Sequence, residues 1–555
     1  MRESEYKKWI LSIKNEEERA LLKGMTKTEI EESFSRDLQF GTGGLRATMG
    51  MGSSKMNRHT VKRATQGVAD YLKAEYKEKI TVVIGYDSRH HSFEFARVAA
   101  AAFAEAGIFV YIFRELLPTP ILSFAVRALG CNAGVMITAS HNPSEYNGYK
   151  VYGADGCQIT DTVAKKIAER ISCVEFFSGK EDYAPEDLFS TGKIAYVPDS
   201  VYGEYLTEVE KLSILGELKT DIKIVYSPLC GTGRVPVCDI FRRKGYRSVT
   251  LVSEQELPNG DFPTCESPNP ELSEAMMLGT EYAKRNKADI FIATDPDCDR
   301  VGVVAADKCG NYHHLTGNEV GLLLCEYVCS LRIKNHTLPD SAEGVKTIVT
   351  SELARKVLES YGVKVTDVLT GFKYIGEYLG TLEGRGIADR FIIGFEESCG
   401  YLFGSYVRDK DGVAAALLIA EMTAYHKSSG KTLIDALEQI YLKYGYEKTC
   451  LKSYSLYGRE GLEKIREVMR ATRAIRKLCD YQIDEVKDYS YGIDGLPKSD
   501  VVKFFINDVG SVTVRPSGTE PKLKVYLCVS SEKREHLDSI ITELLSDFEK
   551  NVGLG

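Results

Sequence analysis

The sequence has no apolar run that reaches the roughly 18 residues needed for a membrane-spanning helix, so we expect no membrane partner. Its first 24 residues, MRESEYKKWILSIKNEEERALLKG, are charged throughout. A signal peptide would need an apolar core and a small-residue cleavage site. The segment 1–24 therefore predicts a short amphipathic helix instead.

Neither sign of charge dominates, because 71 Lys and Arg stand against 79 Asp and Glu, a net charge of −8. We expect no nucleic acid as a partner, and any anion site must be local. The 14 cysteines are scattered and form no Cys-x-x-Cys pair. We therefore expect free thiols rather than a disulfide framework, in a reducing cytosol, and hence a cytoplasmic protein.

The length of 555 residues predicts three to four domains, and 43% hydrophobic residues are enough for substantial cores. Short β-branched runs alternate with helical patterns up to about residue 440, which predicts βαβ units and mostly parallel sheets. The remainder predicts a smaller α+β domain. We expect domain ranges of 1–200, 201–315, 316–440 and 441–555.

A cluster of polar residues, ITASHNPSEYNGYK (137–150), follows the strand-like run AGVMIT. Ser140 would lie at the carboxyl end of that strand, but a serine hydroxyl is a poor nucleophile without help. His141, Asn142 and Lys150 could orient it or bind its product. An Asx or Ser turn explains the same residues, so both interpretations stay open on this stretch alone.

Three carboxylates at alternate positions follow the buried run DIFIAT, in TDPDCDR (294–300). In an extended loop Asp295, Asp297 and Asp299 would turn to one side and need a cation between them. Oxygen ligands alone favour a hard ion such as Mg²⁺. An EF-hand loop would need glycine where Arg300 stands, and that arginine is a donor suited to phosphate.

Two further polar loops are weaker signals by themselves. GFEESCG (394–400) ends another apolar strand, and its acceptors Glu396 and Ser398 suit the vicinal hydroxyls of a sugar; acid–base work and a solvated turn are alternatives. RDKDG (408–412) follows closely and could bring Lys410 to the same rim.

Near the C-terminus, RPSGTEPKLK (515–524) combines cations, hydroxyls and a glycine. Arg515, Ser517, Thr519 and the amides around Gly518 would make an anion nest, although a basic surface turn is the alternative. FGTGGLRATMG (40–50), which holds Arg46, matches neither a P-loop nor a dinucleotide-binding pattern. YSPLCGTGR (226–234) is as compatible with a strand-to-helix turn as with a site.

A serine, a three-carboxylate loop, a sugar-hydroxyl loop and a phosphate nest together predict metal-assisted phosphoryl transfer on a phosphorylated sugar. The motifs TASHNP, DPDCDR, EES and RPSGTEPK, supported by FGTGGLR, GYDSR, TGFKYIG and RDKDG, resemble the α-D-phosphohexomutase superfamily on its phosphoglucomutase/phosphomannomutase branch. They occur in the order of that family between about residues 40 and 526.

The resemblance implies three related α/β domains with mixed, mostly parallel sheets and a smaller C-terminal α+β domain around one cleft. It implies that Ser140 carries the phosphoryl group and that Mg²⁺ is held by the three aspartates and a phosphoserine oxygen. The other implied roles are catalysis by Lys150 and Arg46, substrate binding by Arg300, Lys373, Glu396, Ser398 and Lys410, phosphate binding by Arg515, Ser517, Gly518, Thr519 and Lys524, and support by His141 and Asn142.

The implied intermediate and activator is a sugar bisphosphate such as glucose 1,6-bisphosphate. Some phosphomannomutase-type members carry SGH after the Glu-x-Ser loop, where this sequence has Cys399-Gly400-Tyr401. That departure favours Lys410 over a histidine, and glucose over mannose phosphates. A phosphomannomutase or phosphopentomutase, a serine-dependent metal phosphatase and a non-enzymatic sugar-phosphate sensor are the alternatives. We expect small-molecule sugar phosphates as partners, and a monomer or weak homodimer.

Overall fold

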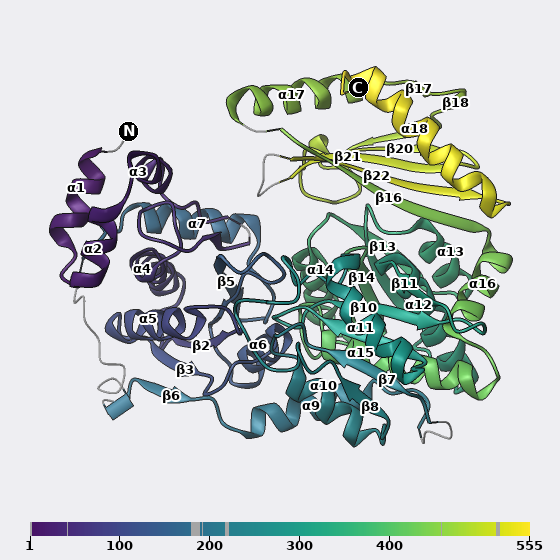
Figure 1. The fold of residues 1–555 in the computed structure, drawn as a ribbon, viewed down its shortest axis with the longest axis horizontal. Coiled ribbons are helices and arrows are strands. Elements are labelled where there is room, and N and C mark those ends of the chain that lie inside the picture. The colour runs from purple at the N-terminus through teal and green to yellow at the C-terminus, as the bar shows by residue number, and fades with distance from the viewer. Residues whose placement is uncertain are drawn as a thin grey trace.

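The computed structural model describes residues 3–41, 43–178, 189–190, 192–216, 221–456, 458–517 and 522–554. Three α/β domains follow one another along the chain, and a smaller C-terminal domain lies above the third (Figure 1). This architecture confirms the predicted fold class. The predicted domain ranges stay predictions.

The first domain is built on a six-stranded sheet in the order β1-β5-β4-β2-β3-β6. Both faces of this sheet are buried: Val82 and Ile84 pack on the side of α4, α5 and α7, whereas Val83 packs on the side of α6. The strands are β1 (Leu45–Thr48), β2 (Thr81–Tyr86), β3 (Phe109–Ile112), β4 (Ala133–Ile137), β5 (Tyr146–Gly153) and β6 (Ile194–Tyr196). The helices are α4 (Arg58–Glu75), α5 (Ser92–Glu105), α6 (Thr119–Ala128) and α7 (Asp161–Ser172).

The second domain has a five-stranded sheet in the order β11-β10-β9-β7-β8. Its strands are β7 (Ile224–Ser227), β8 (Val249–Leu251), β9 (Ile290–Thr294), β10 (Val301–Ala306) and β11 (Tyr312–Leu315). Its helices are α9 (Ser200–Lys211), α10 (Arg234–Arg243) and α11 (Ser273–Asn286). YSPLCGTGR is the turn between β7 and α10.

The third domain has a four-stranded sheet in the order β13-β12-β14-β15. Its strands are β12 (Glu343–Thr347), β13 (Lys364–Val368), β14 (Phe391–Glu396) and β15 (Gly400–Leu402). Its helices are α12 (Gly317–Lys334), α13 (Glu352–Ser360), α14 (Phe372–Gly384), η1 (Ala388–Arg390), α15 (Gly412–Ser428) and α16 (Leu433–Tyr444). One apolar cluster joins this domain to the second.

The three α/β domains share one strand arrangement. In each sheet three parallel strands are followed by one antiparallel strand: β3-β2-β4 then β5, β8-β7-β9 then β10, and β13-β12-β14 then β15. The loop from the last parallel strand to the antiparallel one therefore occupies the same place in every domain. These loops contain Ser140, the three aspartates and the Glu-Glu-Ser sequence.

The C-terminal domain packs two helices on one antiparallel sheet, with the order β16-β22-β21-β20-β19. The strands of this domain are β16 (Tyr446–Ser455), β17 (Lys477–Leu478), β18 (Tyr481–Gln482), β19 (Glu485–Asp488), β20 (Val502–Ile506), β21 (Gly510–Pro516) and β22 (Lys522–Ser531). The helices are α17 (Gly458–Ala474), η2 (Tyr489–Tyr491), η3 (Arg534–His536) and α18 (Leu537–Val552).

The predicted single helix over residues 1–24 is wrong, because the segment forms α1 (Glu3–Ser12) and α2 (Glu16–Gly24). Asn15 has an extended conformation and its side chain accepts a hydrogen bond from the backbone N–H of Glu18. This N-cap starts a new helix, and α3 (Lys27–Phe34) follows. The buried Trp9 fixes α1 to the first domain by edge contacts with Phe34 and His59.

All 14 cysteines are free thiols, as predicted. Among the described residues, no helix combines the length and the apolar character that crossing a bilayer requires.

Candidate active site

Loops from the first and second domains meet at a buried hydrogen bond. The Oγ of Ser140 donates to Oδ2 of Asp295 over 2.9 Å. Ser140 follows β4 and Asp295 follows β9, and both side chains are almost completely buried. The structure thus brings the predicted nucleophile to the edge of the predicted metal site.

Each of the three corresponding loops contains one non-glycine residue in the left-handed region. The φ angles are 53° at Ser140, 52° at Cys298 and 61° at Cys399. Such conformations are uncommon for residues with a Cβ and persist only where surrounding contacts impose them. Here they turn the chain sharply from the parallel strand into the antiparallel one, which places the loop side chains at the end of the sheet.

Arg89, at the end of GYDSR, holds the serine loop by hydrogen bonds to its backbone. Its guanidinium donates to the backbone carbonyl oxygens of Ser140, Asn142, Pro143 and Tyr146, and its side chain is fully buried beside Asp87. A planar fork with five donors can satisfy several carbonyls at once. Arg89 was not predicted as a site residue, although its motif, GYDSR, is among those that carry the family resemblance.

Asp295, Asp297 and Asp299 form a buried cluster whose ligand oxygens lie within 4.8 Å of one another. Oδ1 of Asp297 and Oδ1 of Asp299 are buried and have no hydrogen-bond partner among the described residues. Burial, followed by the charges of the other two aspartates, raises the pKa of Asp295 well above its usual value. Buried, partly unpaired carboxylate oxygens are what a hard cation such as Mg²⁺ needs, so these residues fit the predicted ion.

Two buried lysines approach the acidic cluster. Nζ of Lys150 lies 2.7 Å from Asp297 and 3.5 Å from Asp299, and Nζ of Lys410 lies 3.1 Å from Asp299. Burial opposes ionisation of Asp297, but the hydrogen bond and charge of Lys150 hold its pKa below the usual range. The structure therefore brings both predicted lysines to Asp299, and Lys150 also to Asp297.

Three further residues fix this cluster, and none of them was predicted from the sequence. Thr119 donates to Oδ2 of Asp297 over 2.9 Å. Asp409 lies 3.1 Å from Nζ of Lys410 and accepts a 2.8 Å hydrogen bond from Tyr152. Asp409 stands inside RDKDG, so a signal was present; the other two contacts join residues with no local pattern.

His141 and Asn142 belong to the serine loop, and Arg46 of β1 lies beside it. NH1 of Arg46 donates to Oδ1 of Asn142 over 3.0 Å, and Nδ1 of His141 is 3.2 Å from Oγ of Ser140. Burial, with Arg300 and other cations, lowers the pKa of His141 well below its usual value, so the ring is neutral. Gly44 allows this arrangement, since a Cβ there would lie 1.8 Å from the carbonyl oxygen of Tyr149.

The predicted sugar loop lies after β14 in the third domain. Oε1 of Glu396 accepts a hydrogen bond from the N–H of Gly371 at the start of α14. NH1 of Arg300 donates to the carbonyl oxygen of Ser398 and pairs with Glu271. Arg300 therefore connects the metal loop to the sugar loop, in addition to any contact with substrate.

Glu397, the second carboxylate of this loop, has an unusual environment. Its Oε2 accepts hydrogen bonds of 3.3 Å from Thr347 and from Thr350. Burial, and then the charge of Glu396, raises the pKa of Glu397 to about 7, while the charge of Arg515 acts in the opposite direction. The C-terminal domain thus faces the sugar loop at this residue.

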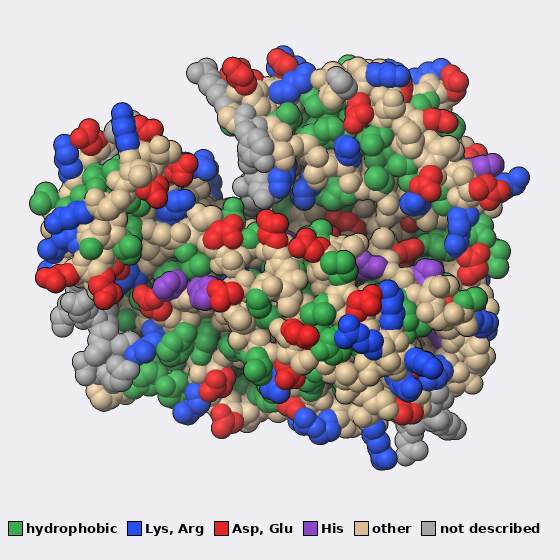
Figure 2. Space-filling view, in the orientation of Figure 1, with side chains coloured by type: hydrophobic (Ala, Val, Ile, Leu, Met, Phe, Trp, Pro, Cys, Tyr) green, Lys and Arg blue, Asp and Glu red, His purple; other side chains and the backbone are tan. Residues whose placement is uncertain are grey.

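The predicted phosphate loop is described only in part, because Gly518 and Thr519 lie outside the described residues. Arg515 is the next-to-last residue of β21, pairs in register with Lys524 on β22, and lies 6.0 Å from the ring centre of Tyr526. Ser517 donates its backbone N–H to the carbonyl oxygen of Lys522. Figure 2 shows a notch between the first domain and the C-terminal domain.

Lys373 lies at the contact between the first and third domains. Its ammonium pairs with Asp161 and sits 4.8 Å from the ring centre of Tyr374. Its role in substrate binding stays a prediction.

Comparisons with known proteins agree with this geometry. Four family models match: "Phosphoglucomutase/phosphomannomutase, alpha/beta/alpha" domain I at residues 37–177, domain II at 201–310 and domain III at 316–444, and the "C-terminal domain" at 462–538. The chain is 35% identical over 532 residues to a phosphoglucomutase of Staphylococcus haemolyticus (strain JCSC1435), covering 93% of this chain and 94% of that protein. It is 36% identical over 514 residues to that of Staphylococcus aureus (strain MRSA252), covering 90% and 91%.

A solved structure shows the same fold. It is the open form of pp63/parafusin from Paramecium, described as a phosphoglucomutase, with a TM-score of 0.71 and 20% identity. The similarity covers 93% of this chain and 96% of that one.

Proposed function

This chain belongs to the phosphoglucomutase/phosphomannomutase family and is a mutase of the isomerase class, and from that premise we propose that it interconverts glucose 1-phosphate and glucose 6-phosphate. The observation that carries the proposal is the 2.9 Å hydrogen bond from Ser140 to Asp295 within a buried acidic cluster flanked by two lysines. In this proposal Ser140 is the phosphate carrier.

The three aspartates would hold Mg²⁺ together with an oxygen of phosphorylated Ser140. When bound, the ion would neutralise charge on the transferring phosphoryl group. Lys150 and Arg46 add positive charge on the side of the serine loop. Arg89 keeps the loop carbonyls in place, so that the serine hydroxyl points at the cluster.

Lys150 and Lys410 are the proposed proton-handling groups, because their Nζ atoms both reach the carboxylate of Asp299, Lys150 from β5 and Lys410 from the loop before α15. Burial lowers the pKa of Lys150, but the charges of Asp297 and Asp299 outweigh burial and raise it, so Lys150 is protonated and would act as a proton donor. Because its lowered pKa makes His141 a weak base, its proposed role is to orient the serine.

The remaining predicted residues would bind the sugar and the phosphate that is not reacting. Glu396 and Ser398 would accept and donate hydrogen bonds to sugar hydroxyls, with Lys410, Arg300 and Lys373 at the rim. The phosphate that is not reacting would be held by the C-terminal loop with Arg515, Ser517, Gly518, Thr519 and Lys524. A bisphosphate such as glucose 1,6-bisphosphate would prime Ser140 and turn over between two transfers.

Preference for glucose phosphates is supported by the names of the similar staphylococcal proteins and by Cys399-Gly400-Tyr401 after the sugar loop. A phosphomannomutase or phosphopentomutase is the nearest alternative, because the metal and phosphate sites serve every such substrate equally. The proposed partners are sugar phosphates alone, and a monomer or weak homodimer stays a prediction.

The test is a coupled assay with purified protein, glucose 1-phosphate, Mg²⁺ and a trace of glucose 1,6-bisphosphate. Glucose 6-phosphate should form, and Ser140→Ala should remove activity. Mannose 1-phosphate and ribose 1-phosphate, run in parallel, separate the mutase types. Release of inorganic phosphate without need for the bisphosphate would favour a phosphatase instead.

A further inference from the structure

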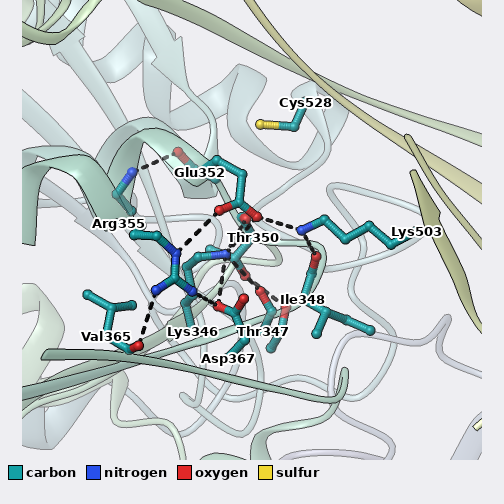
Figure 3. Close-up of polar contacts among 12 residues, drawn as sticks. Lys346, Thr347, Ile348, Thr350, Glu352, Arg355, Val365, Asp367, Lys503 and Cys528 are labelled. Atoms are coloured by element: carbon teal, nitrogen blue, oxygen red, sulfur yellow. Dashed lines mark hydrogen bonds and ion pairs between the residues drawn. The ribbon is translucent and has the colours of Figure 1, made fainter. Parts of the chain in front are cut away.

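The C-terminal domain is fixed to the third domain by a buried polar group at the start of α13, separate from the acidic cluster. Lys346 of the third domain and Lys503 of β20 both bind Oε1 of Glu352 (Figure 3). The exposed fractions of the two lysine side chains are 0% and 1%. Buried lysines are rare and need compensation, so a shared carboxylate here indicates a specific junction.

Two side chains of the C-terminal domain hold the first turn of α13. Nζ of Lys503 donates to the carbonyl oxygen of Ile348 over 2.7 Å. The carboxylate of Glu447, on β16, accepts a 2.9 Å hydrogen bond from the N–H of Leu353 and another from Oγ of Ser351, the N-cap residue. A carboxylate at a helix N-terminus and a cation on a neighbouring carbonyl are both favourable there. We call the contacts of Lys503 and Glu447 with residues 348–353 the interdomain clasp.

The residues held by the clasp also contact the sugar loop. Thr347, the last residue of β12, and Thr350, in the loop before α13, donate to Glu397. Nζ of Lys346 donates to the carbonyl oxygen of Thr350 over 3.1 Å. The turn therefore touches the sugar loop on one side and the C-terminal domain on the other.

On the side of the C-terminal domain, the clasp lies one strand away from the phosphate loop. Lys503 pairs in register with Thr513 on β21, and Arg515 stands two residues further along that strand. Side chains two apart on a strand share a face, so Arg515 moves with Thr513 as one rigid unit. A shift of β20 on α13 would displace Arg515 relative to Glu397.

We propose that Lys503 and Glu447 are positioning residues for the reaction, which set the distance between the phosphate-binding loop and the sugar-binding loop by holding the first turn of α13. The inference rests on the proposed function in one respect, that Arg515 binds the phosphate that is not reacting. A contact between Arg515 and that phosphate contributes equally to the binding of substrate and of transition state. Misplacing Arg515 therefore weakens binding and leaves the chemical step unchanged.

The test compares Lys503→Met with Lys487→Met in the intact protein. Lys487 lies beside Lys503 in register on β19, but it pairs with Asp494 inside the C-terminal domain. Lys503→Met should weaken binding of glucose 1-phosphate about tenfold in calorimetry and raise KM by a similar factor, with kcat within about threefold. Lys487→Met should bind and react like the wild type.

Glu447→Gln, which keeps the shape of the side chain, should change KM in the same direction and carries the test if Lys503→Met does not fold. Small-angle scattering should show a larger radius of gyration for Lys503→Met than for Lys487→Met. Unchanged binding in folded Lys503→Met and Glu447→Gln overturns the proposal. A wild-type protein that neither binds nor converts glucose 1-phosphate contradicts the proposed function instead, and scattering then decides on the clasp.

Discussion

Oγ of Ser140 and Oδ2 of Asp295 are 2.9 Å apart, although 155 positions separate the two residues in the sequence. Both stand in the loop that joins the last parallel strand to the antiparallel strand of their domain. The repeated strand arrangement thus delivers a hydroxyl from one domain and a carboxylate from the next to a single point. A phosphoryl group on Ser140 would be carried directly to the acidic cluster.

Mg²⁺ should stabilise the protein against unfolding, because it would pair with the buried Oδ1 atoms of Asp297 and Asp299. An ion that binds only the folded state adds about 2.7 kcal/mol at a hundredfold excess over its Kd. Thermal unfolding with and without Mg²⁺ measures this, and Asp297→Asn or Asp299→Asn should lose most of the shift.

Asp411→Asn is the matched control for that measurement. Asp411 is buried, and the next residue, Gly412, contacts the metal loop at Cys298, but the carboxylate of Asp411 is bound by Tyr205 and Tyr406 and by the N-terminus of α15. The variant should be less stable and should keep the full Mg²⁺ shift. Equal shifts in all four proteins would show that the ion binds elsewhere.

Arg89→Lys should reduce both stability and turnover, even though it keeps the charge. A lysine cannot satisfy the carbonyls of Ser140, Asn142, Pro143 and Tyr146 together, and each buried carbonyl left unpaired costs about 1–3 kcal/mol. A displaced serine loop should lower kcat on the order of a hundredfold. Chemical unfolding and the coupled assay give the two readouts.

Arg97→Lys provides the comparison for this change. Arg97 belongs to α5 of the same domain, lies over the ring of Phe93, and is outside the serine loop. Its replacement should leave kcat unaltered. If Arg89→Lys also retained full kcat, the guanidinium would not be needed to shape the loop.

The sequence predicted those site residues that stand at strand ends and carry their own chemistry. Ser140 and the three aspartates follow apolar runs, so the edge of a sheet could be inferred for each. The contacts of Arg89 and Thr119 could not, because they join residues 51 and 178 positions apart through the tertiary fold. The clasp on α13 has no local pattern for the same reason.

The break in the N-terminal helix was a different kind of miss, since its signal is visible in the sequence. Asn15 is followed by Glu16, Glu17 and Glu18, which is a strong pattern for an N-cap and first turn. Amphipathic periodicity alone does not predict where one helix ends and the next begins, because apolar residues continue on both sides of the boundary.

Glu397→Gln should change how the stability of the protein depends on pH. Burial and the charge of Glu396 raise the pKa of Glu397 from 4.5 to about 7. Between these values the unfolded chain is ionised at this residue while the folded protein keeps the proton, so wild-type stability falls as pH rises. The loss is at most about 1.4 kcal/mol per pH unit, and glutamine removes it.

The measurement is chemical unfolding of the wild type and Glu397→Gln at pH 5, 6, 7 and 8. The free energy of unfolding of Glu397→Gln should rise relative to that of the wild type up to about pH 7, and the difference should then stay constant. Glu383→Gln is the control, because Arg127 and then Arg408, opposed by burial, lower the pKa of Glu383 to about 2. Glu383 is ionised in both states above pH 4.5, so its difference from the wild type should stay constant from pH 5 to 8. If the difference in stability between Glu397→Gln and the wild type also stayed constant with pH, Glu397 would be ionised in the folded protein, and Thr347 and Thr350 would bind a carboxylate anion.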